Sequence, residues 1–331
     1  IQVCRAGGEG AVDHLARPFD DGARRRALGD LDAGDLDAAA TLLDSVIDHL
    51  VAEERLGLIE HHVDQFPPAT LLGYDKVFNA AVIAYGFRRA FDKANNLLEL
   101  RDRDLDENRA GPRERGLHNH ARLFVLAAQD RVQELGEVAL ESMGQLSERD
   151  GFKLAVAYNG RALYLVAQAQ FEEAREILLK ARPLHDLDGS LFGQAYQEAV
   201  HSMVLSQQGR VSDAIRGLST ALRRTEEEAS GSASAGSAIA AYLVEALYEQ
   251  NRLEEAEALI HDYAPLAEQQ AIADAVAVMV QSTARMAFNR GEEGEAEDLL
   301  DRAIYLGYRH ALPRIVDYAR AELVRQSTLK G

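Results

Sequence analysis

The chain has 331 residues, of which 47% are hydrophobic, so it is long enough to bury a sizeable core. Its 36 Lys and Arg residues stand against 54 Asp and Glu residues, and the formal net charge of -18 argues against binding of nucleic acid or anionic lipid by bulk electrostatics. The single cysteine, Cys4, excludes an intramolecular disulfide, and neither a long apolar run nor a signal-peptide pattern occurs. We therefore expect a cytoplasmic protein that does not enter a membrane.

The first 22 residues, IQVCRAGGEGAVDHLARPFDDG, differ in pattern from the rest of the chain. They match the repeat described below poorly. We expect a cap or the tail of a preceding domain at 1–22, followed by one repeat domain at 23–331. Because the chain begins without Met, we also expect it to be a piece of something longer.

A phrase with a turn, an apolar residue and then a small residue recurs along the chain, as in QAQFEEAREILLKAR from Gln168 to Arg182. The small residue serves as a register mark, and the marks are Ala39, Ala94, Leu135, Ala174, Ala214, Ala256 and Ala296. Successive marks lie 55, 41, 39, 40, 42 and 40 residues apart. After one longer first interval, the period therefore settles near 40 residues.

Each repeat contains two stretches with apolar residues at helical spacing, and no run with the period of a strand occurs. Neither helix can bury its apolar stripe alone, so neighbouring units must stack. The small register residue predicts close approach of the two helices, and Leu135 is the exception. Gly34, Gly209, Gly291 and Asn251 suit a left-handed turn. We expect an all-α, right-handed α-solenoid of TPR-like helix pairs.

Three segments are predicted to be loops from their composition, namely 101–115, 183–190 and 226–237. The third is rich in Gly and Ser, in the sequence EEEASGSASAGS. Its simplest interpretation is a solvated turn between stacked pairs. The alternative is that it becomes ordered around a ligand.

The motifs of catalysis and metal binding are missing. His61 and His62 are adjacent on a predicted helix, and His118 and His120 do not share a helical face, so neither pair forms a metal site. No Gly-Lys dipeptide occurs, which excludes a phosphate-binding P-loop, and the Gly-rich GGEG near the start lacks a preceding strand. We expect no enzyme activity, no metal and no cofactor.

A ligand groove is predicted on the concave wall that the first helices of stacked pairs form. Positions fifteen and eleven residues before each register mark are expected to face it. With nearby tyrosines, they give nine candidate ligand-binding residues: Asn79, His120, Phe124, Asn159, Tyr196, Glu245, Tyr248, Gln281 and Arg285. This mixture suits a polar ligand held by hydrogen bonds and aromatic faces, but the same residues would also be suited to face water.

From about residue 27 to 303 the chain resembles the helical-repeat region of MalT-type large ATP-binding LuxR-family transcriptional regulators. The stretches that carry the resemblance are LDAGDLDAAATLLDSVIDHLVAEERLGLIEHHVDQFPPATL, AYNGRALYLVAQAQFEEAREILLKA, MVLSQQGRVSDAIRGLSTAL and AAYLVEALYEQNRLEEAEALI. The chain departs from the usual tetratricopeptide pattern, because it has no Trp and its period is longer. In that family, the repeat region is the sensor for an inducer or a regulatory partner.

The resemblance implies a non-catalytic sensor domain whose partner is a small-molecule inducer or a regulatory protein or peptide. DNA and ATP would bind only to flanking domains, neither of which is visible in this sequence, so no nucleic acid is expected to bind this segment. The alternative is a stand-alone TPR-like scaffold that binds a peptide or protein. The sequence does not identify the inducer, the oligomeric state or any target genes.

Overall fold

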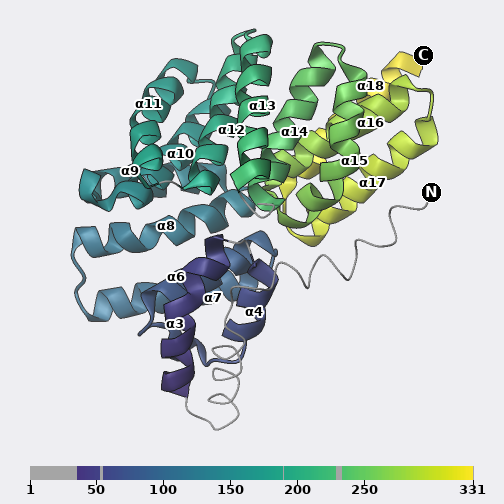
Figure 1. Cartoon of the computed structure of the whole chain (residues 1–331). Helices are drawn as coiled ribbons and strands as arrows, with labels where there is room; N and C mark the ends of the chain where they lie inside the picture. The colour runs from purple at the N-terminus through teal and green to yellow at the C-terminus, as the bar shows by residue number, and fades with distance from the viewer. Residues whose placement is uncertain (1–35, 53–54, 189, 229–232, 331) are drawn as a thin grey trace. The chain divides into compact units, whose positions relative to one another are not determined.

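The computed structural model describes residues 36–52, 55–188, 190–228 and 233–330 (Figure 1). Sixteen α-helices, α3 to α18, and one short 3-10 helix make up the regular structure of these residues, which contain no strand. The all-α prediction is therefore confirmed. The expected cap at 1–22 lies outside the described residues. The chain divides into two compact units, Ile1–Ala81 and Val82–Gly331.

The described part of the first unit consists of short helices around a small apolar core. They are α3 (Leu36–Ala52), α4 (Leu56–Val63), α5 (Pro68–Leu71) and the beginning of α6 (Asp75–Phe87). Ile47, Ile59, Leu71 and Phe78 are fully buried. The interval of 55 residues between the first two register marks reflects the extra helices α4 and α5, which a regular helix pair does not contain.

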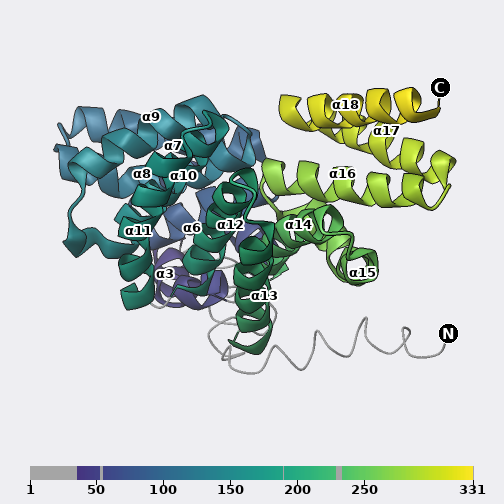
Figure 2. The ribbon, with the colours of Figure 1, turned by 90° about the horizontal axis from the view of Figure 1, so that it is seen from above.

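The second unit, which begins with the last residues of α6, continues as consecutive helices that form an array of pairs. They are α7 (Phe91–Glu107), α8 (Pro112–Ala128), α9 (Val132–Gln145), α10 (Gly151–Ala167), α11 (Phe171–Asp188), α12 (Leu191–Gln207), α13 (Val211–Glu228), α14 (Ala233–Glu249), α15 (Leu253–Gln270), α16 (Ala273–Asn289), α17 (Glu293–Arg309) and α18 (Pro313–Lys330). Each helix packs on the next, and Figure 2 shows α16, α17 and α18 side by side. The arrangement is that of a solenoid.

Alternate helices of the second unit form two layers with different packing. The first-helix layer (α8, α10, α12, α14, α16 and α18) is continuous, because each of its helices also packs on the next member of the layer. The helices of the second-helix layer (α9, α11, α13, α15 and α17) pack instead on their sequence neighbours. First helices therefore stand closer together than second helices, and the array curves around the first-helix layer.

The small register residues lie where the two helices of a pair approach each other. All seven are buried, with exposed fractions of at most 1%. The exception Leu135 is accommodated by Gly160 on α10, where an added Cβ would lie 3.2 Å from the Cδ1 atom of Leu135. A glycine on the first helix of the next pair therefore provides the space that the larger side chain needs.

The turn inside each pair has one repeated left-handed residue, five positions before the register mark. The predicted Gly209, Asn251 and Gly291 have positive φ angles of 76°, 56° and 81°. The residue after each of them donates its N–H to a carbonyl five residues earlier, as in a Schellman motif. In three other pairs, this position is occupied by Arg89, Asp130 and Ala169, which also have positive φ angles. Gly34 lies outside the described residues.

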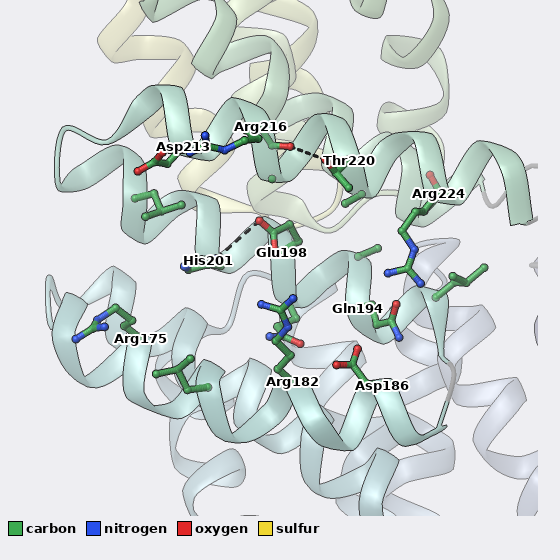
Figure 3. A pocket seen from close by; sticks show the side chains of 18 of the residues that line it. Arg175, Arg182, Asp186, Gln194, Glu198, His201, Asp213, Arg216, Thr220 and Arg224 are labelled. Atoms are coloured by element: carbon green, nitrogen blue, oxygen red, sulfur yellow. Dashed lines mark hydrogen bonds and ion pairs between the residues drawn. The ribbon is translucent and has the colours of Figure 1, made fainter.

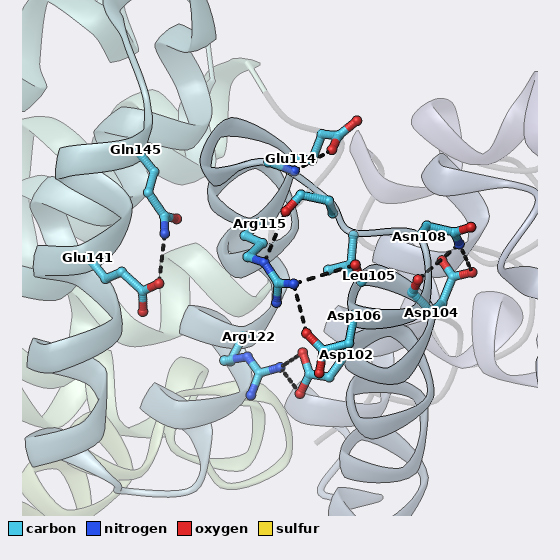
Figure 4. Close-up of polar contacts among 12 residues, drawn as sticks. Asp102, Asp104, Leu105, Asp106, Asn108, Glu114, Arg115, Arg122, Glu141 and Gln145 are labelled. Atoms are coloured by element: carbon cyan, nitrogen blue, oxygen red, sulfur yellow. Dashed lines mark hydrogen bonds and ion pairs between the residues drawn. The ribbon is translucent and has the colours of Figure 1, made fainter.

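The three predicted loops are shorter than their composition suggests. Only residues 108–111 connect α7 to α8, and Figure 4 shows that charged residues of the first predicted loop pair between these helices. Arg122 donates to both carboxylate oxygens of Asp102 at 2.6 and 2.7 Å, and Arg115 reaches Asp106 at 2.7 Å. The loop prediction for 101–115 was wrong because these charges stabilise helix ends.

Most of the second and third predicted loops is also helical. Residues 183–188 extend α11, with Pro183 inside the helix. Residues 226–228 end α13, and 233–237 begin α14. The small residues of that beginning are needed for packing, since Ala235 and Ser237 are fully buried and Gly236 lies against Tyr263. Small size rather than chain flexibility therefore explains this composition.

Within the described part of the chain, no helix is both long and apolar enough to cross a membrane.

Candidate functional site

The first-helix layer brings six of the nine predicted residues into two groups. Phe124 on α8, Asn159 on α10 and Tyr196 on α12 line one small cavity. A second, charged group contains Glu245 and Tyr248 on α14 and Arg285 on α16. The predicted residues therefore form an apolar and a charged half rather than one uniformly polar groove.

The apolar half is a cavity of about 60 Å³ beside a cluster of aromatic rings. Phe192 lies between the other rings of the cluster, with its centroid 5.5 Å from Phe124, 4.7 Å from Tyr196 and 5.7 Å from Phe87. Ile272, from the connection between α15 and α16, closes the cavity from a distant part of the chain. A cavity of this size accepts one small apolar group, because a single water molecule takes about 30 Å³ in the liquid.

Asn159 is held in place by a buried histidine. Its Nδ2 atom donates to the Nε2 atom of His185 at 3.0 Å and to the carbonyl of Gly193 at 3.3 Å. Because Nε2 accepts this bond, the ring carries its proton on Nδ1 and is neutral. Burial lowers the pKa of His185 to about 4, which agrees with the neutral form. The Asn159 Oδ1 atom is buried without a hydrogen-bond partner and is available to a donor group.

Gly193 makes this arrangement possible. A Cβ atom at position 193 would lie 2.3 Å from the Nδ1 atom of His185. Any larger residue would therefore displace the imidazole that orients Asn159.

The charged half is organised around Glu322 on α18. The Nε atom of Arg285 donates to its Oε2 atom at 2.9 Å, while Arg325 and Gln326 donate to the same carboxylate. These donors outweigh the burial of Glu322, whose side chain is 1% exposed, and lower the pKa of its carboxyl. The Arg285 guanidinium also lies over the ring of Tyr248, 5.8 Å from its centroid. Arg285 is therefore oriented by an ion pair and an aromatic face.

Glu245 is the perturbed acid of the charged half. Burial and, next, the negative charge of Asp274 raise the pKa of its carboxyl to about 7, although the positive charge of Arg285 opposes both effects. A group with this pKa changes its charge near neutral pH. It lies on α14, which follows α12 of the apolar half in the order of the first helices.

A chain of buried polar groups fixes the curvature of the first-helix layer. Arg314, in the first turn of α18, donates from its side chain to Asp130 in the α8–α9 turn, and from Nη1 to Asp274 at 2.7 Å. The hydroxyl of Tyr242 donates to the other oxygen of Asp274 at 2.8 Å. A second contact of this kind joins Arg89 to the carbonyl of Glu268 at 2.9 Å. The Arg314–Asp130 and Arg89–Glu268 contacts each connect residues about 180 positions apart. The array of the second unit therefore bends far enough for these parts to meet.

Three predicted residues lie outside the two groups. Asn79 is in the first unit, where its Oδ1 atom is buried without a hydrogen-bond partner. His120 is 6% exposed, its Nδ1 atom lies 2.9 Å from the carbonyl of Leu117, and burial lowers its pKa to about 4. Its ring is therefore a neutral part of the core. Gln281 is partly exposed on α16.

Several residues of this surface were not predicted: Phe87, Arg89, Asp130, Phe192, Tyr242, Asp274, Arg314 and Glu322. The sequence contained a signal that could have identified two of them. Arg89 and Asp130 occupy the left-handed turn position that glycine or asparagine takes in other pairs, and a residue kept there at a conformational cost usually has another role. Phe192 precedes the predicted Tyr196 by one helical turn, so the two lie on the same face of α12, and this spacing could have identified Phe192.

Arg285 is engaged with Glu322 and Arg314 with Asp274, and the described residues contain no group of three or more His, Cys, Asp or Glu residues that could hold a metal ion. No protein-family model matches the chain, and no curated protein shows significant sequence similarity to it.

Proposed function

We propose that the chain is a non-catalytic sensor domain that binds a small-molecule inducer on its first-helix layer, in a regulator of the MalT type. The observation that supports the binding site is the convergence of Phe124, Asn159 and Tyr196 on one cavity. The assignment to a regulator rests on the sequence resemblance alone.

The cavity narrows the chemistry of the proposed ligand. An apolar group enters the space of about 60 Å³ beside Phe192, and a neighbouring donor group meets the free Oδ1 atom of Asn159. Polar parts of the ligand then extend toward Glu245 and Arg285. The ligand is thus expected to be amphipathic rather than uniformly polar.

A cavity-filling variant tests this proposal. Ala127 lines the cavity, so Ala127→Leu places three additional carbon atoms in it. The probes are small amides that carry one branched-alkyl or phenyl group, and their binding is measured by saturation-transfer NMR. We expect binding to the wild type and its loss in Ala127→Leu.

The matched control is Ala258→Leu, on an exposed position of α15. It adds the same atoms at a distance from the cavity and should bind the probes as the wild type does. Equal binding by all three proteins, or no binding of any probe, would contradict the proposal.

The alternative is a stand-alone scaffold that binds a peptide or protein through the same surface. One apolar side chain of a peptide also fits the cavity. The coding sequence on either side of this segment separates the two: a nucleotide-binding module before it and a helix-turn-helix module after it support the regulator.

A further inference from the structure

A second cavity lies on the outer side of the array, between α11 and α13. Its volume is about 490 Å³, which is within the usual range of ligand-binding clefts. Figure 3 shows its floor on α12 and its walls on α11 and α13. These two second helices pack on α12 rather than on each other, so the gap between them is open along their length. We call this cavity the outer groove.

The outer groove is locally basic although the chain is strongly acidic. Five arginines line it, against three carboxylates at Asp186, Glu198 and Asp213; the arginines are Arg175, Arg182, Arg210, Arg216 and Arg224. The formal net charge of the whole chain is -18. A local excess of guanidinium groups on such a chain favours an anionic occupant.

Arginine side chains extend over the floor of the groove from both of its walls. Figure 3 shows Arg182 on α11 and Arg224 on α13 directed toward the space over α12. Arg216 pairs with Asp213, but its side chain is 75% exposed. Exposed pairs of this kind contribute little to stability, so exchange for a partner's carboxylate costs little.

The groove also offers apolar surface. Leu179 on α11 is 61% exposed, and Leu191, Leu205 and Ala221 line the cavity with it. Apolar and basic groups in one groove match a helix that has one apolar and one acidic face.

The distribution of the charges favours an elongated occupant. The lining residues of α11 extend from Arg175 to Asp186, roughly 16 Å along the helix at about 1.5 Å per residue. The arginines on α13 extend over a similar length. A compact anion would reach only a few of them, whereas a helix of about three turns reaches both ends.

The carboxylates of the groove restrict how that helix lies. Glu198, on the floor, sits against α13 at Gly217, where an added Cβ would lie 2.0 Å from its Oε1 atom. His201 is 3.7 Å from the same atom. Since Glu198 repels acidic groups, the occupant must keep its carboxylates away from the floor and place them at the edges.

We propose that the outer groove binds an acidic amphipathic helix of a partner protein. Arg182, Arg216 and Arg224 pair with its carboxylates, and Leu179 packs on its apolar face. This inference does not depend on the proposed function, because the groove and the first-helix cavity have no lining residue in common.

The test uses the full chain and a fluorescein-labelled peptide of about 15 residues, enough for a marginally stable helix. The peptide carries Leu on one helical face and Glu on the other, and binding is measured by fluorescence anisotropy at low salt. We expect saturable binding that weakens as salt screens the charges. The triple variant Arg182→Glu, Arg216→Glu, Arg224→Glu should weaken it at least about ten-fold, and so should Leu179→Asp.

Three controls make the result specific. The triple variant Arg103→Glu, Arg149→Glu, Arg309→Glu makes the same charge change at exposed positions of other helices and should bind as the wild type does, as should Ala127→Leu. A peptide with Lys in place of Glu should not bind. Circular dichroism and thermal melting establish that each variant is folded.

Absence of binding, or equal loss in both triple variants, would overturn the proposal. It would also be overturned if Leu179→Asp binds normally while inorganic phosphate displaces the peptide, because the groove would then be a site for small anions.

Discussion

Arg314 in α18 contacts Asp130, 184 positions earlier in the chain, through both its side chain and its backbone N–H, which donates to the Oδ2 atom of Asp130 at 3.1 Å. The Asp130 side chain is 0% exposed, and burial raises the pKa of its carboxyl although Arg314 acts in the opposite direction. Asp274, 4% exposed, shares the same guanidinium. One arginine thus balances two buried acids and connects the α8–α9 turn to α18.

The variant Arg314→Met is expected to destabilise the protein by about 3–5 kcal/mol, because it leaves buried carboxylates without a counter-charge. Urea unfolding at neutral pH measures the loss. The control Arg302→Met breaks an ion pair with Glu268 whose side chains are 69% and 46% exposed, and should cost at most about 1 kcal/mol. Equal losses in the two variants would mean that the buried ion pairs of Arg314 contribute no more to stability than an exposed ion pair.

Ala169 and Asp130, which both have positive φ angles, are expected to respond differently to substitution by glycine. Ala169→Gly should stabilise the protein by up to about 1 kcal/mol, since glycine relieves a left-handed strain of roughly 1–2 kcal/mol but loses more entropy on folding. Asp130→Gly relieves the same strain but removes the contact to Arg314, so a net loss of stability is expected. Thermal unfolding of both variants decides this, and stabilisation by Asp130→Gly would refute the role of the contact.

Leu135 and Gly160 should be energetically coupled. Leu135→Ala is expected to cost about 2–5 kcal/mol, because it leaves a cavity between α9 and α10. In that background Gly160→Ala should stabilise, since the added methyl group fills space and alanine favours the helix. In the wild type, the same methyl group would lie 3.2 Å from Leu135 and gain less.

A double-mutant cycle from chemical unfolding measures this coupling, expected at about 0.5–3 kcal/mol. Gly144→Ala on α9 is the control, because a Cβ there meets no atom within 4 Å and its effect should be equal in both backgrounds. Additive effects of Leu135→Ala and Gly160→Ala would show that the two residues do not compensate each other.

Glu245 should make stability depend on pH near neutrality. Its pKa is about 7 in the folded protein and about 4.5 when unfolded, so between these values the folded state binds more protons. Stability contributed by this group is therefore full below pH 4.5 and decreases as pH rises to 7, by at most about 1.4 kcal/mol per pH unit.

Urea unfolding of wild type and Glu245→Gln between pH 4.5 and 8 isolates this contribution. The variant should lose that part of the pH dependence and be more stable than the wild type at pH 8. The control Glu254→Gln changes an exposed residue of the next helix, α15, and should keep the wild-type slope. Identical slopes in wild type and Glu245→Gln would contradict the assignment.

Local sequence was sufficient to predict the helices, the period and the close contacts within a pair. Apolar spacing reports which face of a helix is buried, and a small residue such as Ala174 or Ala214 reports where two helices approach, because both properties depend on neighbours in the chain. The same reasoning failed for 226–228 and 233–237, where Ala235 and Gly236 are small for packing and not for flexibility. Residues 229–232 of that predicted loop lie outside the described residues.

The tertiary structure alone decided which predicted residues meet. Counting along the first helices selected Phe124 and Asn159, and Tyr196 was added as a nearby aromatic residue. Only the tertiary structure shows that these three line one cavity with Ile272 and that Arg285 pairs with Glu322. Small rotations between successive units add up over the array, and only their sum brings Arg314 to Asp130. The repeat pattern predicts how each unit packs on the next, whereas the contact of Arg314 with Asp130 depends on the accumulated rotation of the units between them.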